Sequence, residues 1–235
     1  MFYFDPLYIL LVAPALLFSI FAALRVKTTF KKYSQMRTAR GMTGADAAKT
    51  VLSANGVYDV RIEQVSGNLS DHFDPKNKVI RLSDAVYNAA SPAAVGVAAH
   101  EAGHAVQYAQ NYAPIRLRAA IIPATNIGSK LSVPLVLLGI LFMRYSDMFY
   151  WVAVAGIVCF GLCVLFQLIT LPTEYNASRR ALRAIEGNHL LLPDEQKGAK
   201  KVLSAAALTY VAALSVSLMQ MLRLVLRLTS YRRRY

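Results

Sequence analysis

Charged residues are scarce in this chain of 235 residues: they make up 17% of the sequence, whereas hydrophobic residues make up 56%. Soluble domains usually carry about 25% charged residues. The composition therefore excludes an ordinary soluble protein, and the mean hydropathy of +0.38 agrees. It also excludes an intrinsically disordered chain and a coiled coil. Cysteine is rarer still, since Cys159 and Cys163 are the only two and both lie in an apolar run, which excludes a secreted disulfide scaffold.

Acidic residues are also few, 13 against 26 lysines and arginines, which gives a net charge of +13. In a membrane protein such an excess marks the cytoplasmic side. The basic residues are not interleaved with aromatic residues, as they are on a nucleic-acid-binding surface. We therefore expect the lipid bilayer as a partner and no nucleic acid.

Residues 8–24 form an uncharged apolar run that, together with Leu7, reaches the roughly 17–20 residues of a membrane-spanning helix. The run lacks the positive start and the small-residue cleavage site of a signal peptide. We predict an uncleaved anchor with its N-terminus outside. The basic residues that follow it are Arg25, Lys27, Lys31, Lys32, Arg37 and Arg40.

Two further apolar runs, residues 131–143 and 148–173, are separated by only four residues, which leaves room for a tight turn alone. The uncharged residues 121–129 precede the first run, and Lys130 between them has a side chain long enough to reach an interface. These runs predict a helical hairpin, which returns the chain to the side of the membrane that it left.

A fourth apolar run, residues 202–222, is also long enough to span the membrane. An arginine-rich tail follows it, and a spanning helix would leave this tail outside, against the usual bias. The run therefore predicts either a spanning helix or one that lies in the interface. The basic residues after the first run, with six more between residues 179 and 201, favour a cytoplasmic location for the middle of the chain.

The mixed composition of residues 28–120 predicts a small region with helices and strands. A capping box at residues 43–46 begins a helix that ends near residue 55. Clusters of β-branched residues at 57–65 and 78–82 predict two short strands. A serine and a proline at residues 91–92 begin a helix that reaches about residue 110.

This last helix contains the sequence His-Glu-Ala-Gly-His at residues 100–104. His100 and His104 lie one turn apart on the same helix face, so both imidazoles can bind one Zn²⁺ ion. Glu101 can take a proton from zinc-bound water as the general base of a hydrolase. Without a metal, burying two imidazoles and a carboxylate unpaired would cost several kcal/mol. The motif therefore predicts one zinc ion per chain.

A catalytic zinc site needs a third protein ligand and a position for water. His72 and His189 do not lie at the spacing of a third-histidine motif, whereas Glu174 directly follows the third apolar run. Because a hairpin crosses the membrane twice, Glu174 returns to the side of His104. We predict that Glu174 completes the ligand set; the alternative is a carboxylate that is merely favoured by the dipole at a helix N-terminus.

The chain resembles the YugP-like family of neutral zinc metallopeptidases in residues 98–107, around the two histidines, and in residues 171–180, around Glu174. It resembles the same family in residues 67–75 and 202–210, so the likeness covers nearly the whole chain. The resemblance implies peptidase activity and does not identify the substrate.

More distantly, the layout is similar to the membrane zinc proteases of the HtpX and CAAX-prenyl-protease group, which use two histidines and a glutamate as ligands. Their glutamate lies in a Glu-x-x-Ala-Asp pattern, whereas here Ser178 replaces the aspartate that would orient a ligand histidine. The oxyanion of peptide hydrolysis also needs a hydrogen-bond donor. The residues that are candidates for one of these two roles are His72, Tyr175, Ser178, Arg179, Arg180 and His189.

Two smaller patterns have alternative interpretations. Residues 78–82 are either an edge strand that offers its backbone to an extended substrate or an ordinary paired strand. Asp71 and Asp74, on either side of His72, indicate a turn capped by aspartates more simply than a second metal site.

Together these patterns predict a mainly α membrane protein, with transmembrane helices plus a small α+β zincin-like domain of the gluzincin type that contains a short β-hairpin. The expected segments are an N-terminal anchor at residues 1–27, a cytoplasmic zincin-like domain at 28–120, a transmembrane hairpin at 121–173, a third-ligand helix and loop at 174–201, and a fourth apolar helix with a basic tail at 202–235.

The function that we expect is that of a multi-pass, zinc-dependent endopeptidase of the cell membrane, with its catalytic site on the cytoplasmic side and a peptide or membrane protein as substrate. The alternative is a non-catalytic membrane scaffold with a structural zinc site. A transporter or channel is disfavoured, because the hairpin runs carry no ionisable residue beyond Lys130. The sequence leaves the protein partners and the oligomeric state open.

Overall fold

A computed structural model describes residues 5–67 and 70–232 of the chain. The first four residues of the expected anchor, residues 68–69 and the last three residues of the basic tail lie outside the described part. The chain divides into two compact units. We call them the helical unit (Met1–Phe21, Leu117–Leu171 and Tyr210–Tyr235) and the sheet unit (Ala22–Arg116 and Pro172–Thr209).

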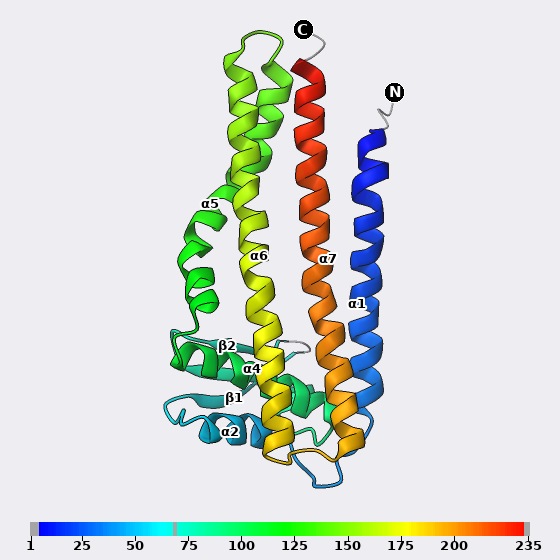
Figure 1. Ribbon diagram of the computed structural model, residues 1–235, viewed down its shortest axis with the longest axis vertical. Helices are drawn as coiled ribbons and strands as arrows, with labels where there is room; N and C mark the ends of the chain where they lie inside the picture. Colours follow the sequence, from blue (N-terminus) through cyan, green and yellow to red (C-terminus); the bar gives the residue numbers. More distant parts are fainter. Residues whose placement is uncertain (1–4, 68–69, 233–235) are drawn as a thin grey trace. The chain divides into compact units, whose positions relative to one another are not determined.

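The described residues are mostly helical and form one small sheet (Figure 1). The elements in chain order are a short π-helix (Tyr8–Val12), α1 (Ala13–Ser34), α2 (Gly44–Ala54), β1 (Arg61–Val65), β2 (His72–Asp74), β3 (Val79–Ser83), α3 (Asp84–Tyr87), α4 (Pro92–Ala109), α5 (Ala113–Phe142), α6 (Met148–Gly187) and α7 (Pro193–Arg232).

Four helical segments of the described chain are long and apolar enough to cross a membrane: Tyr8–Ser34, Ala113–Phe142, Met148–Gly187 and Pro193–Ser230. Large apolar side chains of the helical unit are exposed, among them Leu17, Leu137 and Trp151, as expected for side chains that face lipid. The fourth apolar run is part of a single helix of 40 residues, which favours the spanning alternative over an interfacial one.

Glycines allow α5 and α6 of the helical unit to pack closely. A Cβ atom on Gly139 would lie 2.5 Å from the backbone nitrogen of Ala153, and one on Gly156 would lie 2.7 Å from that of Val136. Small residues at helix–helix contacts are typical of membrane bundles, in which packing replaces the hydrophobic effect as the source of stability. The two helices form the hairpin that the short connection predicted.

The end of α7 is tied to the start of the chain by ion pairs within the helical unit. Asp5 accepts hydrogen bonds from Arg223 at 2.7 Å and from Arg227 at 3.0 Å, and the Arg223 guanidinium lies over the Tyr8 ring. The N-terminus of the first apolar helix and the end of the last one therefore lie at the same end of this unit.

The sheet has three strands in the order β1-β3-β2. β1 pairs with β3 in parallel, and β2 pairs with β3 antiparallel, so that β2 and β3 form a short hairpin. The sequence predicted only two strands and missed β2, because its three residues lie between turn-forming segments. β3 is paired on both sides, so the interpretation of residues 78–82 as an edge strand is wrong.

Alanines of α4 contribute to the core of the sheet unit, together with larger apolar side chains of α2, β3 and α6. The fully buried Ala98, Ala99 and Ala102 pack with side chains of α2, β3 and α6. Small side chains on nearly every face let other elements approach α4 closely, so this helix is enclosed by its neighbours. Both predicted N-terminal caps are present: Thr43 and Asp46 form a capping box, and Ser91 accepts a hydrogen bond from Ala94.

Candidate metal centre

Helix α4 and the part of α6 in the sheet unit approach each other at Gly103. A Cβ atom on Gly103 would lie 2.8 Å from the carbonyl oxygen of Ala177. At this distance no side chain fits at position 103 unless the backbone shifts. The glycine in the middle of the His-Glu-Ala-Gly-His sequence thus sets the spacing between the two helices. Near this contact, His100 and His104 on α4 lie next to Glu174 on α6.

Three atoms of these side chains converge. The Nε2 atoms of His100 and His104 lie 3.1 Å apart, and Oε2 of Glu174 lies 3.3 Å from the first and 3.4 Å from the second. Glu174 is 2% exposed and His104 is 8% exposed. Among the described residues, these three form the one group of His, Cys, Asp or Glu that could hold a metal ion.

The spacing of these atoms fits a zinc ion. Ligands at about 2.0–2.1 Å from a tetrahedral Zn²⁺ are separated from one another by about 3.3 Å, and the three distances observed here lie close to that value. Two imidazole nitrogens and one carboxylate oxygen are also a donor set that zinc accepts in catalytic sites. The residues therefore fit the ion without rearrangement.

Each of these two histidines has a hydrogen-bond partner at its other ring nitrogen. Nδ1 of His104 lies 3.0 Å from Oε1 of Gln107, and Nδ1 of His100 lies 3.1 Å from the hydroxyl of Ser178. Outer partners of this kind orient a ligand imidazole toward its metal. Ser178 was a candidate from the sequence, whereas Gln107 was missed; its signal was a polar residue three positions after His104 on an otherwise alanine-rich helix.

The environment of His104 changes its proton affinity. Burial by itself lowers the pKa of His104, but the hydrogen bond to Glu174 and the charges of Glu101 and Glu174 outweigh burial and raise the pKa above its ordinary value. In the absence of a metal, the neighbouring carboxylates therefore favour the protonated form of His104. A metal ion that binds here must displace this proton, because zinc coordinates the unprotonated nitrogen.

Glu101 is half-buried on α4, next to His100 in the chain, and its charge acts on His104. On α6, Arg180 donates hydrogen bonds to Asn176 at 2.7 Å and to Gln110 at 2.6 Å. Tyr175 and Arg179 on the same helix are exposed.

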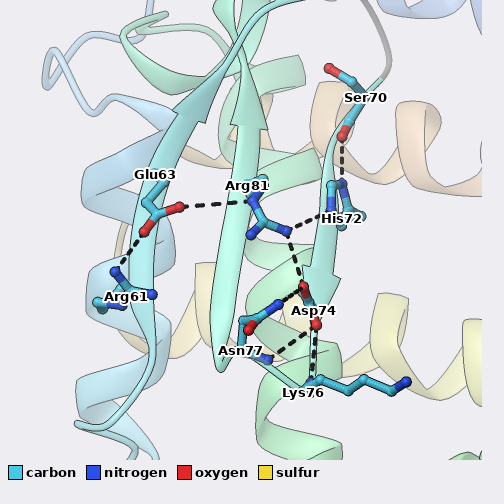
Figure 2. Close-up of polar contacts among 8 residues, drawn as sticks. All are labelled: Arg61, Glu63, Ser70, His72, Asp74, Lys76, Asn77 and Arg81. Carbon is cyan, nitrogen blue, oxygen red and sulfur yellow. Dashed lines mark hydrogen bonds and ion pairs between the residues drawn. The ribbon is translucent and has the colours of Figure 1, made fainter.

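The other two candidate histidines have partners elsewhere. Figure 2 shows His72 on β2 with its ring between the carbonyl of Ser70, at 2.8 Å, and the guanidinium of Arg81, at 3.4 Å. His189 follows α6 in a left-handed backbone conformation, and its carbonyl accepts a hydrogen bond from Arg40. Neither belongs to the group that converges at Glu174.

The two aspartates beside His72 have structural partners. Asp71 accepts hydrogen bonds from the backbone and the hydroxyl of Ser83. Asp74 accepts from the backbone nitrogens of Lys76 and Asn77 in the turn before β3, as Figure 2 shows for Asp74. The turn interpretation of these aspartates is the one that the structure supports.

Comparison with known proteins agrees with this geometry. The model of a family described as "Putative neutral zinc metallopeptidase" matches residues 8–229. A protein of Bacillus subtilis (strain 168) with the name "Putative membrane protease YugP" is 44% identical over 220 residues, which cover 94% of this chain and 96% of that protein. No solved structure matches the chain significantly.

Proposed function

Since the chain belongs to this family of neutral zinc metallopeptidases, we propose that it is a membrane-embedded zinc endopeptidase in which His100, His104 and Glu174 hold the ion and Glu101 is the general base. The observation that carries this proposal is the convergence of the two Nε2 atoms and Oε2 of Glu174 at distances that fit tetrahedral zinc.

The protein residues have separate tasks in this hydrolysis. Zn²⁺, when bound, supplies a Lewis acid that polarises a peptide carbonyl and lowers the pKa of water. Glu101 accepts a proton from the attacking water and delivers it to the leaving amine, because a carboxylate within reach can act first as base and then as acid. The two histidines and Glu174 hold their positions throughout.

The number of ligands favours catalysis over a structural role for zinc. Structural zinc sites have four protein ligands, whereas catalytic sites have three and keep a position for water. The group among the described residues contains three. This observation makes a non-catalytic scaffold the weaker of the two proposals.

The sheet unit resembles a zincin-like domain in its local arrangement: a helix that carries the paired histidines lies against a small sheet. The ring of Phe73 on β2 lies 6.1 Å from that of Tyr108 on α4, which puts this strand beside the helix. β2 is at the edge of the sheet. We propose that an extended peptide pairs with this edge, since the outer side of an edge strand offers backbone donors and acceptors to a ligand.

We place the sheet unit in the cytoplasm, because the basic residues that follow the first apolar run belong to it. With four crossings, the end of α7 then lies outside. Two arginines of that end are paired with Asp5.

Single cysteines at Asn77 and Ser230, in a chain without Cys159 and Cys163, test this orientation. Residue 77 should react with an impermeant label only after permeabilisation and residue 230 in intact cells; the reverse pattern would invert the topology.

The catalytic assignment is tested with Glu101→Gln in the full-length protein. This variant should bind zinc as the wild type does and lose cleavage of casein or a peptide by about 10²–10⁴-fold, the usual contribution of a general base. Glu186→Gln, which changes an exposed glutamate at the end of α6, is the matched control and should keep full activity. Turnover retained by Glu101→Gln would refute the role of Glu101.

A further inference from the structure

The side chain of Gln107 is fully buried and reaches from α4 to α6. Its Oε1 faces Nδ1 of His104 at 3.0 Å, and its Nε2 lies 2.9 Å from both the carbonyl oxygen of Thr173 and Oδ1 of Asn176. Thr173 immediately precedes the ligand Glu174. One amide thus joins a ligand histidine on one helix to the backbone beside the third ligand on the other.

The orientation of this amide follows from its partners. A carbonyl oxygen can only accept hydrogen bonds, so Thr173 requires a donor from Gln107. The guanidinium of Arg180 can only donate, and its Nε lies 2.7 Å from Oδ1 of Asn176. That oxygen must therefore be an acceptor too. Both neighbours require Nε2 of Gln107 to face them, which leaves Oε1 as the atom that faces His104.

The orientation of the amide fixes the tautomer of His104. Because Oε1 of Gln107 has no hydrogen to donate, Nδ1 of His104 must carry the proton in the hydrogen bond between them. In the neutral ring, Nε2 then has a free electron pair. This is the nitrogen that lies beside His100 and Glu174.

We propose that Gln107 is a positioning residue that locks His104 in the Nδ1–H tautomer and aims its Nε2 at the metal, and that Asn176 and Arg180 hold the amide of Gln107 in the required orientation. The proposal rests on the proposed zinc site but not on peptide cleavage. His104 thus has an outer hydrogen-bond partner of its own. The serine at position 178, where the related proteases have an aspartate, contacts His100 and does not affect this partner.

The two ligand histidines differ in this respect. The hydroxyl of Ser178 can donate or accept, so its contact with Nδ1 of His100 permits either tautomer. Gln107 permits only one. Loss of Gln107 should therefore weaken zinc binding more than loss of the Ser178 hydroxyl.

Zinc affinity of full-length variants, measured by competition with a chelator of known affinity, gives the first test. Gln107→Leu should bind zinc about 10–100-fold more weakly, the usual effect of removing an outer partner of a ligand. Gln196→Leu is the matched control, because Gln196 is a half-buried glutamine of the sheet unit whose amide, like that of Gln107, donates to a backbone carbonyl, here that of Leu191. The zinc affinity of this control should equal that of the wild type. A Gln107→Leu affinity within about threefold of the wild type overturns the proposal.

The tautomer itself is measured in the wild type, which removes any dependence on the folding of a variant. The chain has only four histidines, so ¹⁵N-histidine labelling gives four pairs of ring signals. The single variants His72→Gln, His189→Gln and His100→Gln serve only to assign three of these pairs, and the fourth belongs to His104. In the chelated protein at alkaline pH, His104 should carry its proton on Nδ1. A proton on Nε2 of His104 overturns the proposal.

These readouts separate the proposal from the proposed function, because neither needs a substrate. If Glu101→Gln retained cleavage while Gln107→Leu weakened zinc binding, the catalytic assignment would fall and the tautomer lock would stand. If Glu101→Gln lost cleavage while Gln107→Leu bound zinc normally, the reverse would hold.

Discussion

Two places in the sheet unit bring histidine and carboxylate side chains together, and they differ in what faces the carboxylates. On the exposed face of the sheet, Arg81 lies 3.1 Å from Asp74 and 3.8 Å from Glu63, with His72 beside it (Figure 2). Between α4 and α6, Glu174 instead faces two imidazole nitrogens.

The comparison teaches that composition alone does not make a metal site. We call Glu63, His72, Asp74 and Arg81 the outer cluster, and His100, His104 and Glu174 the inner group. In the outer cluster, the carboxylate oxygens already have partners, namely Arg81 and the N–H donors of the turn. In the inner group, the Nε2 atoms of His100 and His104 and Oε2 of Glu174 point at one another, an arrangement that is unfavourable unless a proton or a metal ion lies between them. Because the inner group is buried, its free energy is high when neither a proton nor a metal ion lies between these atoms.

The largest expected difference between the two places comes from removing one carboxylate in each. Glu174→Gln keeps the shape of the side chain but removes its charge, so zinc affinity should fall by more than about 100-fold, beyond the effect of an outer partner. Asp74→Asn should leave it unchanged. Chelator competition measures both, and equal affinities in the two variants would contradict the assignment of Glu174.

A second test changes the spacing between α4 and α6. Gly103→Ala puts a methyl group 2.8 Å from the carbonyl oxygen of Ala177, so the helices must separate; we expect a loss of about 1–3 kcal/mol in stability, as overpacking usually causes, together with weaker zinc binding. Gly187→Ala, where no atom lies within 4 Å of the new Cβ, is the control. Thermal unfolding with and without zinc gives both quantities, and wild-type behaviour of Gly103→Ala would show that this contact does not set the site.

How much of this could be predicted from the sequence depends on the length scale. The apolar runs and the four-residue connection predicted the helices of the helical unit, and the capping residues at Thr43 and Ser91 predicted where α2 and α4 begin. The approach of His100 to His104 could be predicted because it depends only on the period of a helix. Glu174 needed the further inference that a hairpin returns the chain to its starting side.

The missed features depend on contacts between distant segments. Gln107 looked like an ordinary polar residue near a helix end, and its role appears only once α6 brings Thr173 and Asn176 to it. β2 is too short for an alternating pattern and is stabilised by pairing with β3. The sequence could not show these contacts, because nothing local in it fixes which helix faces lie together.

The pH dependence should also distinguish the two places. The pKa of His104 is raised, so in the chelated protein its protonation stabilises the fold below the ordinary histidine pKa of about 6.5, and this stability is lost as the pH rises through the raised value. Zinc binding should follow the opposite sign and strengthen with rising pH, by up to about tenfold per unit for one displaced proton.

The carboxylate of Asp74 in the outer cluster should not titrate in that range. Hydrogen bonds from Asn77, and from Arg81, hold the pKa of Asp74 well below its usual value. Zinc affinity and chelated-protein stability, measured between pH 6 and 8, should therefore change in the wild type and in Asp74→Asn alike. A flat zinc affinity over this range would show that no proton is displaced.

The smallest expected effect is that of Ser178→Ala. The hydroxyl contacts Nδ1 of His100 but does not fix its tautomer, so zinc affinity should fall by less than about tenfold, at the low end of outer-partner effects. Chelator competition in parallel with Gln107→Leu gives the comparison. A larger loss in Ser178→Ala than in Gln107→Leu would reverse the ranking of the two outer partners.

The most direct test of zinc at this site is X-ray absorption at the zinc edge on the full-length, zinc-loaded protein. One zinc ion per chain should show two imidazole nitrogens and a carboxylate oxygen at about 2.0–2.1 Å, and the imidazole signal should decrease in His104→Ala. A spectrum without imidazole ligands, or one that His104→Ala leaves unchanged, would contradict the assignment of His100, His104 and Glu174 as the metal ligands.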